Sequence, residues 1–301
     1  MSTIIPNVVP GSDGSGIVIS IGSKVTRFSV GDKVLPLISK PNSADKLDEI
    51  ALVETPLGSR RDGTFREYGV FPEDGLVSMP QSLTWREGAT LACSGLTAWN
   101  ALFGLSRREV KKGDVVLVQG TGSVSMFALQ LAKAIGAVVI ATTGSAEKAE
   151  RLRKLDHPPD HIIDYAKTPE WGEVVKKLAG DGKGVDFIIE VGGPATMEQS
   201  FKALRFGGII AVIGAVGGKG KGDNAGWMDI LRHGCLVRGV LMGNRRQFEE
   251  MNTFIDERGM RPVLDEKTWD LVDLKEAYEH LVSFFYEGRG LEVLNQANDE
   301  V

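Results

Sequence analysis

The amino-acid sequence predicts an α/β fold in which a doubly wound parallel sheet is joined to a smaller antiparallel β unit. In residues 14–77, short β-branched segments are separated by glycine and proline, which is typical of a twisted antiparallel unit. From about Trp85 onward, apolar strands alternate with helical segments of roughly 10 to 15 residues, the pattern of βαβ units. A glycine turn between the first of these strands and the next helix predicts a ligand site at that edge of the sheet.

The β unit is predicted from the stretch GSGIVISIGSKVTRFSVGDKVLPL, which begins at Gly14. Ile17, Ile19 and Ile21 occupy alternate positions in it, as in a strand with one apolar face. The frequent glycines keep its strands short. We therefore expect a small antiparallel sheet before the α/β part begins.

The α/β part contains enough strand segments for a complete doubly wound sheet. Six are expected, at residues 115–119, 138–142, 161–163, 185–191, 208–213 and 236–241. Near the end of the chain, residues 261–285 predict a strand, a turn and a helix that folds back on the β unit. One face of that helix carries Leu274, Ala277, Tyr278 and Leu281.

Composition excludes several classes of function. The net charge of −5 arises from 40 acidic and 35 basic residues that are interspersed, so no basic stripe is available for nucleic acid. No uncharged apolar run reaches the roughly 18 residues that a membrane span needs, and the first residues lack the pattern of a signal peptide. We expect a cytoplasmic protein without a nucleic-acid or membrane partner. The two cysteines, Cys93 and Cys235, are expected to be buried, inert thiols.

A glycine turn follows the strand at 115–119. Apolar residues then recur at helical spacing from Val124 onward. This order places free backbone N–H groups and the positive end of a helix dipole where a pyrophosphate can bind. The full dinucleotide motif has a third glycine, and here Ser125 takes its place, so an ordinary glycine turn stays open as the alternative. The residues of the turn that we expect at the ligand are Gly120, Gly122, Ser123 and Val124.

The end of the next strand indicates which dinucleotide is bound. Sites that prefer NAD place an acid there, whereas this strand runs into Thr143, Gly144 and Ser145, with Lys148 just behind. Hydroxyls and an ammonium suit a 2′-phosphate, so the sequence favours NADP(H). Glu147 is explained by its place in the first turn of a helix, and Lys148 could instead be a solvated helix residue.

Five stretches together resemble a known family: GSDGSGIVISIGSKVTRFSVGDKV, EGATLACSGLTAWNAL, GTGSVSMFALQLAKAIGA, GVDFIIEVGG and GGIIAVIG. In this order they are similar to the zinc-independent medium-chain dehydrogenase/reductases, the quinone oxidoreductase-like and alcohol dehydrogenase-like proteins. The resemblance covers nearly the whole chain. It implies a GroES-like catalytic domain at 1–95 and 260–301, and a Rossmann NADP-binding domain at 96–259, with cofactor and substrate between them.

The resemblance also implies roles for individual residues, although it identifies no catalytic one. Thr97 would lie near the nicotinamide, and Tyr165 would join Thr143 and Lys148 around the 2′-phosphate, unless it is a strand-end aromatic without a ligand. The rest of the cofactor groove would be lined by Val191, Gly192, Ile213 and Gly214.

Zinc-dependent relatives carry a Gly-His-Glu motif, a catalytic cysteine and a lobe with four cysteines. The matching position here is Gly11-Ser12-Asp13, and two cysteines cannot supply such sites, so we expect no metal. The family also has further strands before this segment. Relative to that pattern, the sequence is expected to be shortened at its N-terminus, with an incomplete GroES-like domain.

The resemblance implies an NADPH-dependent oxidoreductase that transfers hydride to a quinone, an enone or a related carbonyl compound. Its activity would be reduced if the catalytic domain is incomplete. The alternative is a non-catalytic NADPH-binding protein or sensor derived from such a reductase. Family members pair through the edges of their parallel sheets, which would make this protein a homodimer through residues 236–241.

Overall fold

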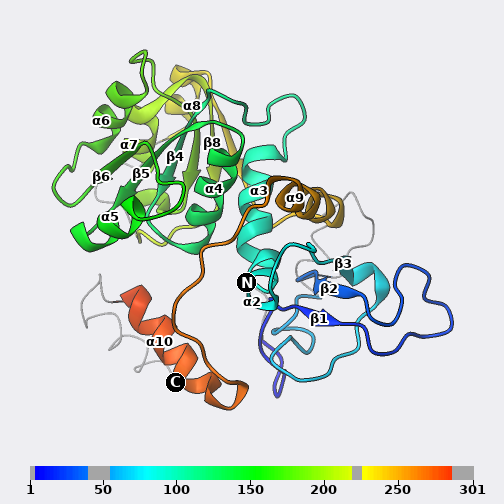
Figure 1. Ribbon diagram of the computed structural model, residues 1–301. Coiled ribbons are helices and arrows are strands. Elements are labelled where there is room, and N and C mark those ends of the chain that lie inside the picture. Colours follow the sequence, from blue (N-terminus) through cyan, green and yellow to red (C-terminus); the bar gives the residue numbers. More distant parts are fainter. Residues whose placement is uncertain (1–3, 40–54, 219–225, 287–301) are drawn as a thin grey trace.

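The computed structural model describes residues 4–39, 55–218 and 226–286, and these form two sheets (Figure 1). A six-stranded parallel sheet with helices on both faces forms one part, and a three-stranded antiparallel sheet forms the other. Helices α3 (Leu96–Phe103) and α9 (Arg245–Arg258) lie between them. The predicted fold class is therefore confirmed.

The parallel sheet has the strand order β6-β5-β4-β7-β8-β9, and every pairing in it is parallel. All six predicted strands are present, although only β4 has the predicted bounds and the other five differ from them. Because the strands are parallel, the loops after their carboxyl ends lie at one edge of the sheet. The strands are β4 (Val115–Gln119), β5 (Val138–Thr143), β6 (His161–Asp164), β7 (Val185–Glu190), β8 (Leu204–Val212) and β9 (Leu236–Gly239).

Strand β4 is buried on both faces because helices cover both sides of the sheet (Figure 1). Val116 and Val118 pack with Phe127 in one hydrophobic core, whereas Leu117 packs with Trp171 in a second core. No helix among the described residues combines the length and apolarity needed to cross a membrane. The helices of this part, besides α9, are α4 (Ser123–Ala134), α5 (Ala146–Arg153), α6 (Trp171–Leu178), η3 (Gly193–Ala195), α7 (Met197–Ala203) and α8 (Trp227–His233).

The β unit is antiparallel, as predicted, and its strands pair in the order β1-β2-β3. Leu35 and Val77 from this sheet are fully buried and share a core with Val116 of the parallel sheet. The division into domains at residues 96 and 259 stays a prediction. The elements of this part are β1 (Gly16–Ile17), β2 (Lys33–Pro36), η1 (Glu73–Gly75), β3 (Leu76–Ser78), α2 (Trp85–Gly88) and the π-helix η2 (Leu91–Gly95).

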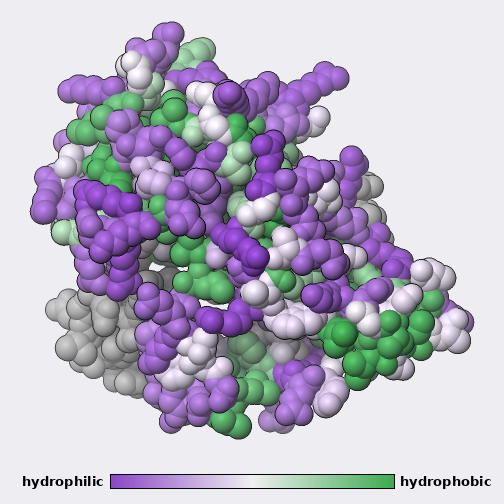
Figure 2. Space-filling view, in the orientation of Figure 1, coloured by the Kyte–Doolittle hydropathy of each residue, from purple (hydrophilic) through white to green (hydrophobic). Residues whose placement is uncertain are grey.

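One face of the β unit carries exposed apolar side chains. Ile17 and Ile19 are 52% and 63% exposed, and Val70 is 95% exposed. The space-filling view shows a hydrophobic region at the end of the molecule where β1 and β2 lie in Figure 1 (Figure 2). The strand predicted through Ile21 is shorter than expected, because β1 ends at Ile17 and the isoleucines beyond it are exposed outside any strand.

The strand expected at the start of residues 261–285 is absent, although these residues are described. Their backbone is paired by a side chain of α4 instead: Gln130 donates to the Arg261 carbonyl at 2.6 Å and accepts from the Val263 N–H at 3.4 Å. The chain then forms η4 (Leu271–Asp273) and α10 (Leu274–Tyr286). Tyr278 of α10 contacts Phe65 at 6.1 Å between ring centroids, so the helix folds back on the β unit as predicted.

We predict that the β unit exchanges its amide hydrogens faster than the parallel sheet. Strand β1 has two residues and one hydrogen-bonded neighbour, whereas β4 is buried between β5 and β7. Hydrogen exchange followed by mass spectrometry should give fast exchange across residues 14–31 and slow exchange across Val115–Gln119. Equal protection of both segments would contradict this.

Candidate functional site

The first group of predicted site residues lies where β4 turns into α4. Gly120 has a φ of +72°, and a Cβ atom on Gly120 or Gly122 would meet no atom within 4 Å. Gly122 is the N-cap of α4, and no side chain caps this helix end. The first N–H groups of α4, including those of Ser123 and Val124, therefore face open space with the positive end of the helix dipole. This geometry suits a pyrophosphate.

Ser125 shows how the helix tolerates the loss of the third glycine. Its side chain is 2% exposed, and its hydroxyl donates to the Gln119 carbonyl at 2.7 Å. The hydroxyl is thus satisfied by the end of β4 instead of opposing the packing of helix on strand. The serine keeps α4 close to the sheet while leaving the N–H groups before it free for a ligand.

The second group of predicted residues comes together at the ends of β5 and β6. The Tyr165 N–H donates to the Thr143 carbonyl at 3.0 Å, and a Cβ on Gly144 would collide with the Tyr165 hydroxyl. Ser145 caps α5 by accepting from the Lys148 N–H at 3.2 Å. Thr143 is fully buried and its hydroxyl has no hydrogen-bond partner in the protein, so it lies behind the surface that the others form.

The third group lies in the loops after β7 and β8, which are hydrogen-bonded to each other. The Val216 N–H donates to the Val191 carbonyl at 3.0 Å, while a Cβ on Gly214 would stand 3.3 Å from that same carbonyl oxygen. Gly192 is buried, whereas Val191 and Ile213 are half-buried. The three groups therefore follow the carboxyl ends of neighbouring strands, with the third group beside the glycine turn.

Thr97 is held differently from the other candidates. It is 4% exposed, and its hydroxyl donates to the Cys93 carbonyl one turn earlier at 2.7 Å. Ser94 instead makes the contact with the glycine turn, because its hydroxyl donates to Ser123 Oγ at 2.7 Å. The sequence analysis missed Ser94, although its position three residues before Thr97 places the two on one helix face.

Asp13, in the segment that the resemblance matches to the Gly-His-Glu motif of zinc-dependent relatives, is hydrogen-bonded to Cys93. Asp13 Oδ1 accepts from the Cys93 N–H at 2.8 Å, and Oδ2 accepts from the Ser12 hydroxyl at 2.7 Å. Burial raises the pKa of Asp13, and burial together with the nearby Asp13 charge raises the pKa of the Cys93 thiol to about 11. Among the described residues, no three His, Cys, Asp or Glu side chains lie together as a metal site would need.

The two cysteines differ in part from the prediction. Both are free, as expected, but each is half-buried instead of buried. Burial raises the pKa of Cys235 as well as that of Cys93, so both thiols stay protonated at neutral pH. A raised pKa favours low reactivity, which stays a prediction.

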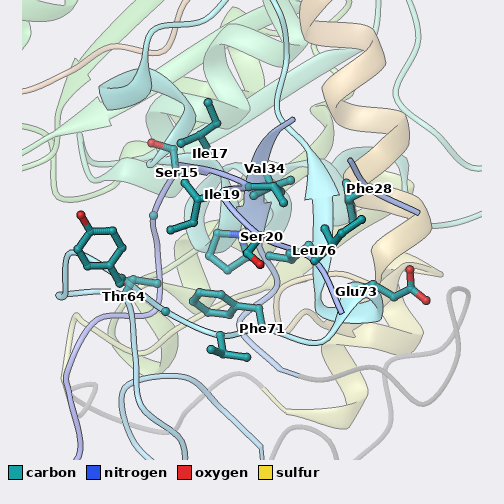
Figure 3. Close-up of a pocket in the computed structure, with 18 of the residues that line it drawn as sticks. Ser15, Ile17, Ile19, Ser20, Phe28, Val34, Thr64, Phe71, Glu73 and Leu76 are labelled. Atoms are coloured by element: carbon teal, nitrogen blue, oxygen red, sulfur yellow. The ribbon is translucent and has the colours of Figure 1, made fainter. Parts of the chain in front are cut away.

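A cavity of about 920 Å³ lies in the β unit, away from these groups (Figure 3). Ile17, Ile19, Val34 and Phe71 line it, and none of the predicted cofactor residues does. The cavity is therefore a feature of the exposed face of the β unit and is lined by other residues than those predicted to bind a cofactor.

Comparison with known proteins identifies the family. Residues 2–81 match the family described as alcohol dehydrogenase GroES-like domain, and residues 123–257 match the one described as zinc-binding dehydrogenase. A zinc-type alcohol dehydrogenase-like protein of Schizosaccharomyces pombe is 40% identical over 284 residues, 94% of this chain and 81% of that protein. Quinone oxidoreductase of Mus musculus is 31% identical over 210 residues, 69% of this chain and 56% of that protein.

Solved structures agree. The crystal structure of a putative alcohol dehydrogenase from Sinorhizobium meliloti has a TM-score of 0.83 and 38% identity, and the match covers 93% of this chain and 80% of that one. The chain therefore belongs to the medium-chain dehydrogenase/reductase family. It is an oxidoreductase of that family with a GroES-like domain.

Proposed function

We propose that this protein is an NADPH-dependent oxidoreductase that transfers hydride to a quinone, an enone or a related carbonyl compound without a metal ion. The observation that carries the proposal is the uncapped N-terminus of α4 beside Gly120 and Gly122, where open space meets free N–H groups. Relatives named quinone oxidoreductase and 2-haloacrylate reductase, each 31% identical, support the substrate class.

The three groups of residues fit a dinucleotide laid across the carboxyl edge of the sheet. The pyrophosphate would bind the N–H groups at the start of α4, because they lie where the strand order reverses between β4 and β7. In the proposal the cofactor is held by Thr97, Gly120, Gly122, Ser123, Val124, Thr143, Gly144, Ser145, Lys148, Tyr165, Val191, Gly192, Ile213 and Gly214.

The surroundings of Ser145 support NADPH over NADH. Its hydroxyl oxygen accepts from the Lys148 N–H, which leaves the hydroxyl proton for an anion. The nearest acid in sequence, Glu147, is paired with Arg151 at 2.7 Å along α5. No carboxylate from this loop is therefore committed to a ribose hydroxyl, and the loop offers donors to a 2′-phosphate.

NADPH, when bound, supplies the hydride, and in the proposal the protein holds its reacting end between the two parts, as the resemblance to the family implies. Quinones and enones suit this site because the anion formed on hydride addition is delocalised and needs no Lewis acid. Asp13 and Cys93 provide two donors where a zinc site needs at least three protein ligands, so the described residues do not fit zinc there. Zinc binding, which the names of some relatives mention, is therefore not proposed for this protein.

We also propose that the protein forms a homodimer through β9. This strand is the edge of the parallel sheet and pairs only with β8 among the described strands. Apolar side chains lie exposed beside it, with Phe206 at 74%, Trp227 at 87% and Leu241 at 65%. An open edge with adjacent apolar surface favours pairing of two copies.

The proposed location is the cytoplasm, which the two free cysteines support.

The function predicts that the purified protein reduces quinones or enones with NADPH as the reductant. Turnover should persist in EDTA, and elemental analysis should find far less than one zinc per chain. One zinc per chain, or activity abolished by EDTA, would overturn the metal-free mechanism. Tight NADPH binding without turnover of any quinone or enone would instead favour the alternative of a sensor, which the open face of the β unit also supports.

The cofactor assignment predicts tighter binding of NADPH than of NADH. Lys148→Ala should weaken NADPH about tenfold or more, because a charge-assisted hydrogen bond to a phosphate is lost, and should leave NADH unchanged. Fluorescence titration of both dinucleotides measures this. Lys154→Ala, at the other end of α5, is the matched control. Equal affinities for the two dinucleotides would sink the assignment.

The dimer proposal predicts a mass of two chains by light scattering. Leu241→Glu should shift the protein toward the monomer, since two carboxylates would face each other across the two-fold axis. Val70→Glu is the matched control, because Val70 is exposed on the β unit and lies far from β9 in sequence and sheet. A wild-type monomer at micromolar concentration would refute the dimer.

A further inference from the structure

A buried carboxylate and a buried amide meet behind the glycine turn. Glu190 ends β7 and is 0% exposed, and Gln119 ends the neighbouring β4 and is 5% exposed. Their side chains are joined by a hydrogen bond from Gln119 Nε2 to Glu190 Oε2 at 2.7 Å. The two residues therefore connect the strands between which the order of the sheet reverses.

Glu190 accepts hydrogen bonds on both of its oxygens. Oε1 accepts from the N–H groups of Gly192 and Gly193, each at 2.9 Å, and from the Thr196 hydroxyl at 2.5 Å. Oε2 accepts from Gln119 and from the Ser200 hydroxyl. A carboxylate saturated with donors is stable when buried, and it fixes the backbone of the turn that supplies them.

Gln119 connects this network to the loop after β7 on one side and to α4 on the other. Its Oε1 accepts from the N–H groups of Val191 and Gly192, each at 3.2 Å. Its carbonyl accepts from Ser125, which holds α4 against the strand. Gly120, the next residue, begins the glycine turn. One side chain therefore ties the loop after β7 to the turn that presents the N–H groups of α4.

The third cofactor segment depends on the same pair. The Ile213 N–H donates to the Glu190 carbonyl at 2.8 Å, so the start of the loop after β8 is attached to this residue. Gly193 has a φ of +74°, and a Cβ there would lie 2.7 Å from Ala215 Cα, so the turn that Glu190 holds packs closely on that loop. The pair thus lies beneath three of the proposed cofactor segments.

We propose that Glu190, acting through Gln119, is a positioning residue that sets the backbone of the dinucleotide groove. This inference rests on the proposed NADPH function. Glu190 is fully buried and touches no ligand; it acts by holding Val191, Gly192 and the glycine turn in register with one another. The groove therefore owes its shape to a specific pattern of donors and acceptors in addition to the glycines at its surface.

The hydrogen bonds around Glu190 and Gln119 can all be made in only one arrangement of donors and acceptors, so a substitution that exchanges a donor for an acceptor should disturb them. Glu190→Gln replaces one acceptor oxygen with an amide donor. Placed toward Gly192 and Gly193, the amide meets two backbone donors; placed toward Gln119, it meets the Gln119 amide. If the Gln119 side chain flips to avoid this, its own NH₂ group points at the backbone N–H groups of Val191 and Gly192. Two donors oppose each other in every arrangement.

We expect Glu190→Gln to weaken NADPH binding roughly tenfold or more. Amide exchange at Gly192 and Gly193 should accelerate in the ligand-free protein, since their common acceptor is impaired. Titration fluorescence and hydrogen exchange measure the two effects. Thr196→Val, which removes one donor and keeps the carboxylate, should give a smaller change of the same sign if the first variant does not fold.

The double variant Gln119→Glu/Glu190→Gln distinguishes positioning from general destabilisation. With the carboxylate moved to position 119, the new amide at position 190 donates to it and still accepts from Gly192 and Gly193. Every donor regains an acceptor, so NADPH affinity should recover most of the loss. Glu87→Gln is the matched control, since Glu87 is a buried carboxylate that accepts from the backbone N–H of Thr84 in the β unit. It should lower stability without changing NADPH affinity.

Unchanged NADPH affinity in Glu190→Gln, beside normal wild-type binding, would overturn this inference alone. An equal loss in Glu87→Gln, or no recovery in the double variant, would also overturn it, because the effect would then follow stability. Failure of the wild-type protein to bind NADPH would overturn the proposed function and this inference together.

Discussion

The ladder that holds β4 between β5 and β7 determines where every candidate site residue lies. Val116 is in register with Val139 on one side and Phe187 on the other, and both pairings are parallel. Because all three strands run the same way, their loops emerge at one edge, and residues that are about 70 positions apart in sequence become neighbours. The glycine turn comes to lie beside the loop after β7 only through this register. A displaced neighbour would separate the turn from the loop after β7.

The proposed cofactor site combines two opposite arrangements of backbone groups in adjacent layers. The first N–H groups of α4 are left without side-chain caps, which is costly unless an anion or water satisfies them. The layer beneath is satisfied almost completely: Ser125 is bonded to Gln119, and Glu190 accepts five hydrogen bonds. Because the buried acceptors already have their hydrogen-bond donors, they offer no partner to the free N–H groups at the start of α4. In the proposed function, the rigid buried layer keeps these N–H groups available to the pyrophosphate.

The features that could be predicted from the sequence are those set by local residue patterns. The run at 115–119 predicted β4 to the residue, since five consecutive apolar or buried positions between turns leave few alternatives. The strand expected at the start of residues 261–285 did not form, because the backbone of Arg261 and Val263 pairs with the side chain of Gln130, more than 130 residues away. The pair of Gln119 and Glu190 was missed for the same reason. Neither residue has a local signal, and their roles arise only when β4 and β7 are placed side by side.

The two sheets differ in how completely their faces are covered. The parallel sheet has helices on both faces, whereas Ile17, Ile19 and Val70 of the β unit remain exposed around a cavity. The β unit is nevertheless attached firmly at its inner end, where Asp13 accepts from the backbone of Cys93 and the adjacent Ser94 donates to Ser123. These bonds run from the β unit through η2 to the start of α4. In the proposed function the β unit is therefore positioned by its contacts with the start of α4, and this attachment does not depend on how completely the outer face of the β unit is covered.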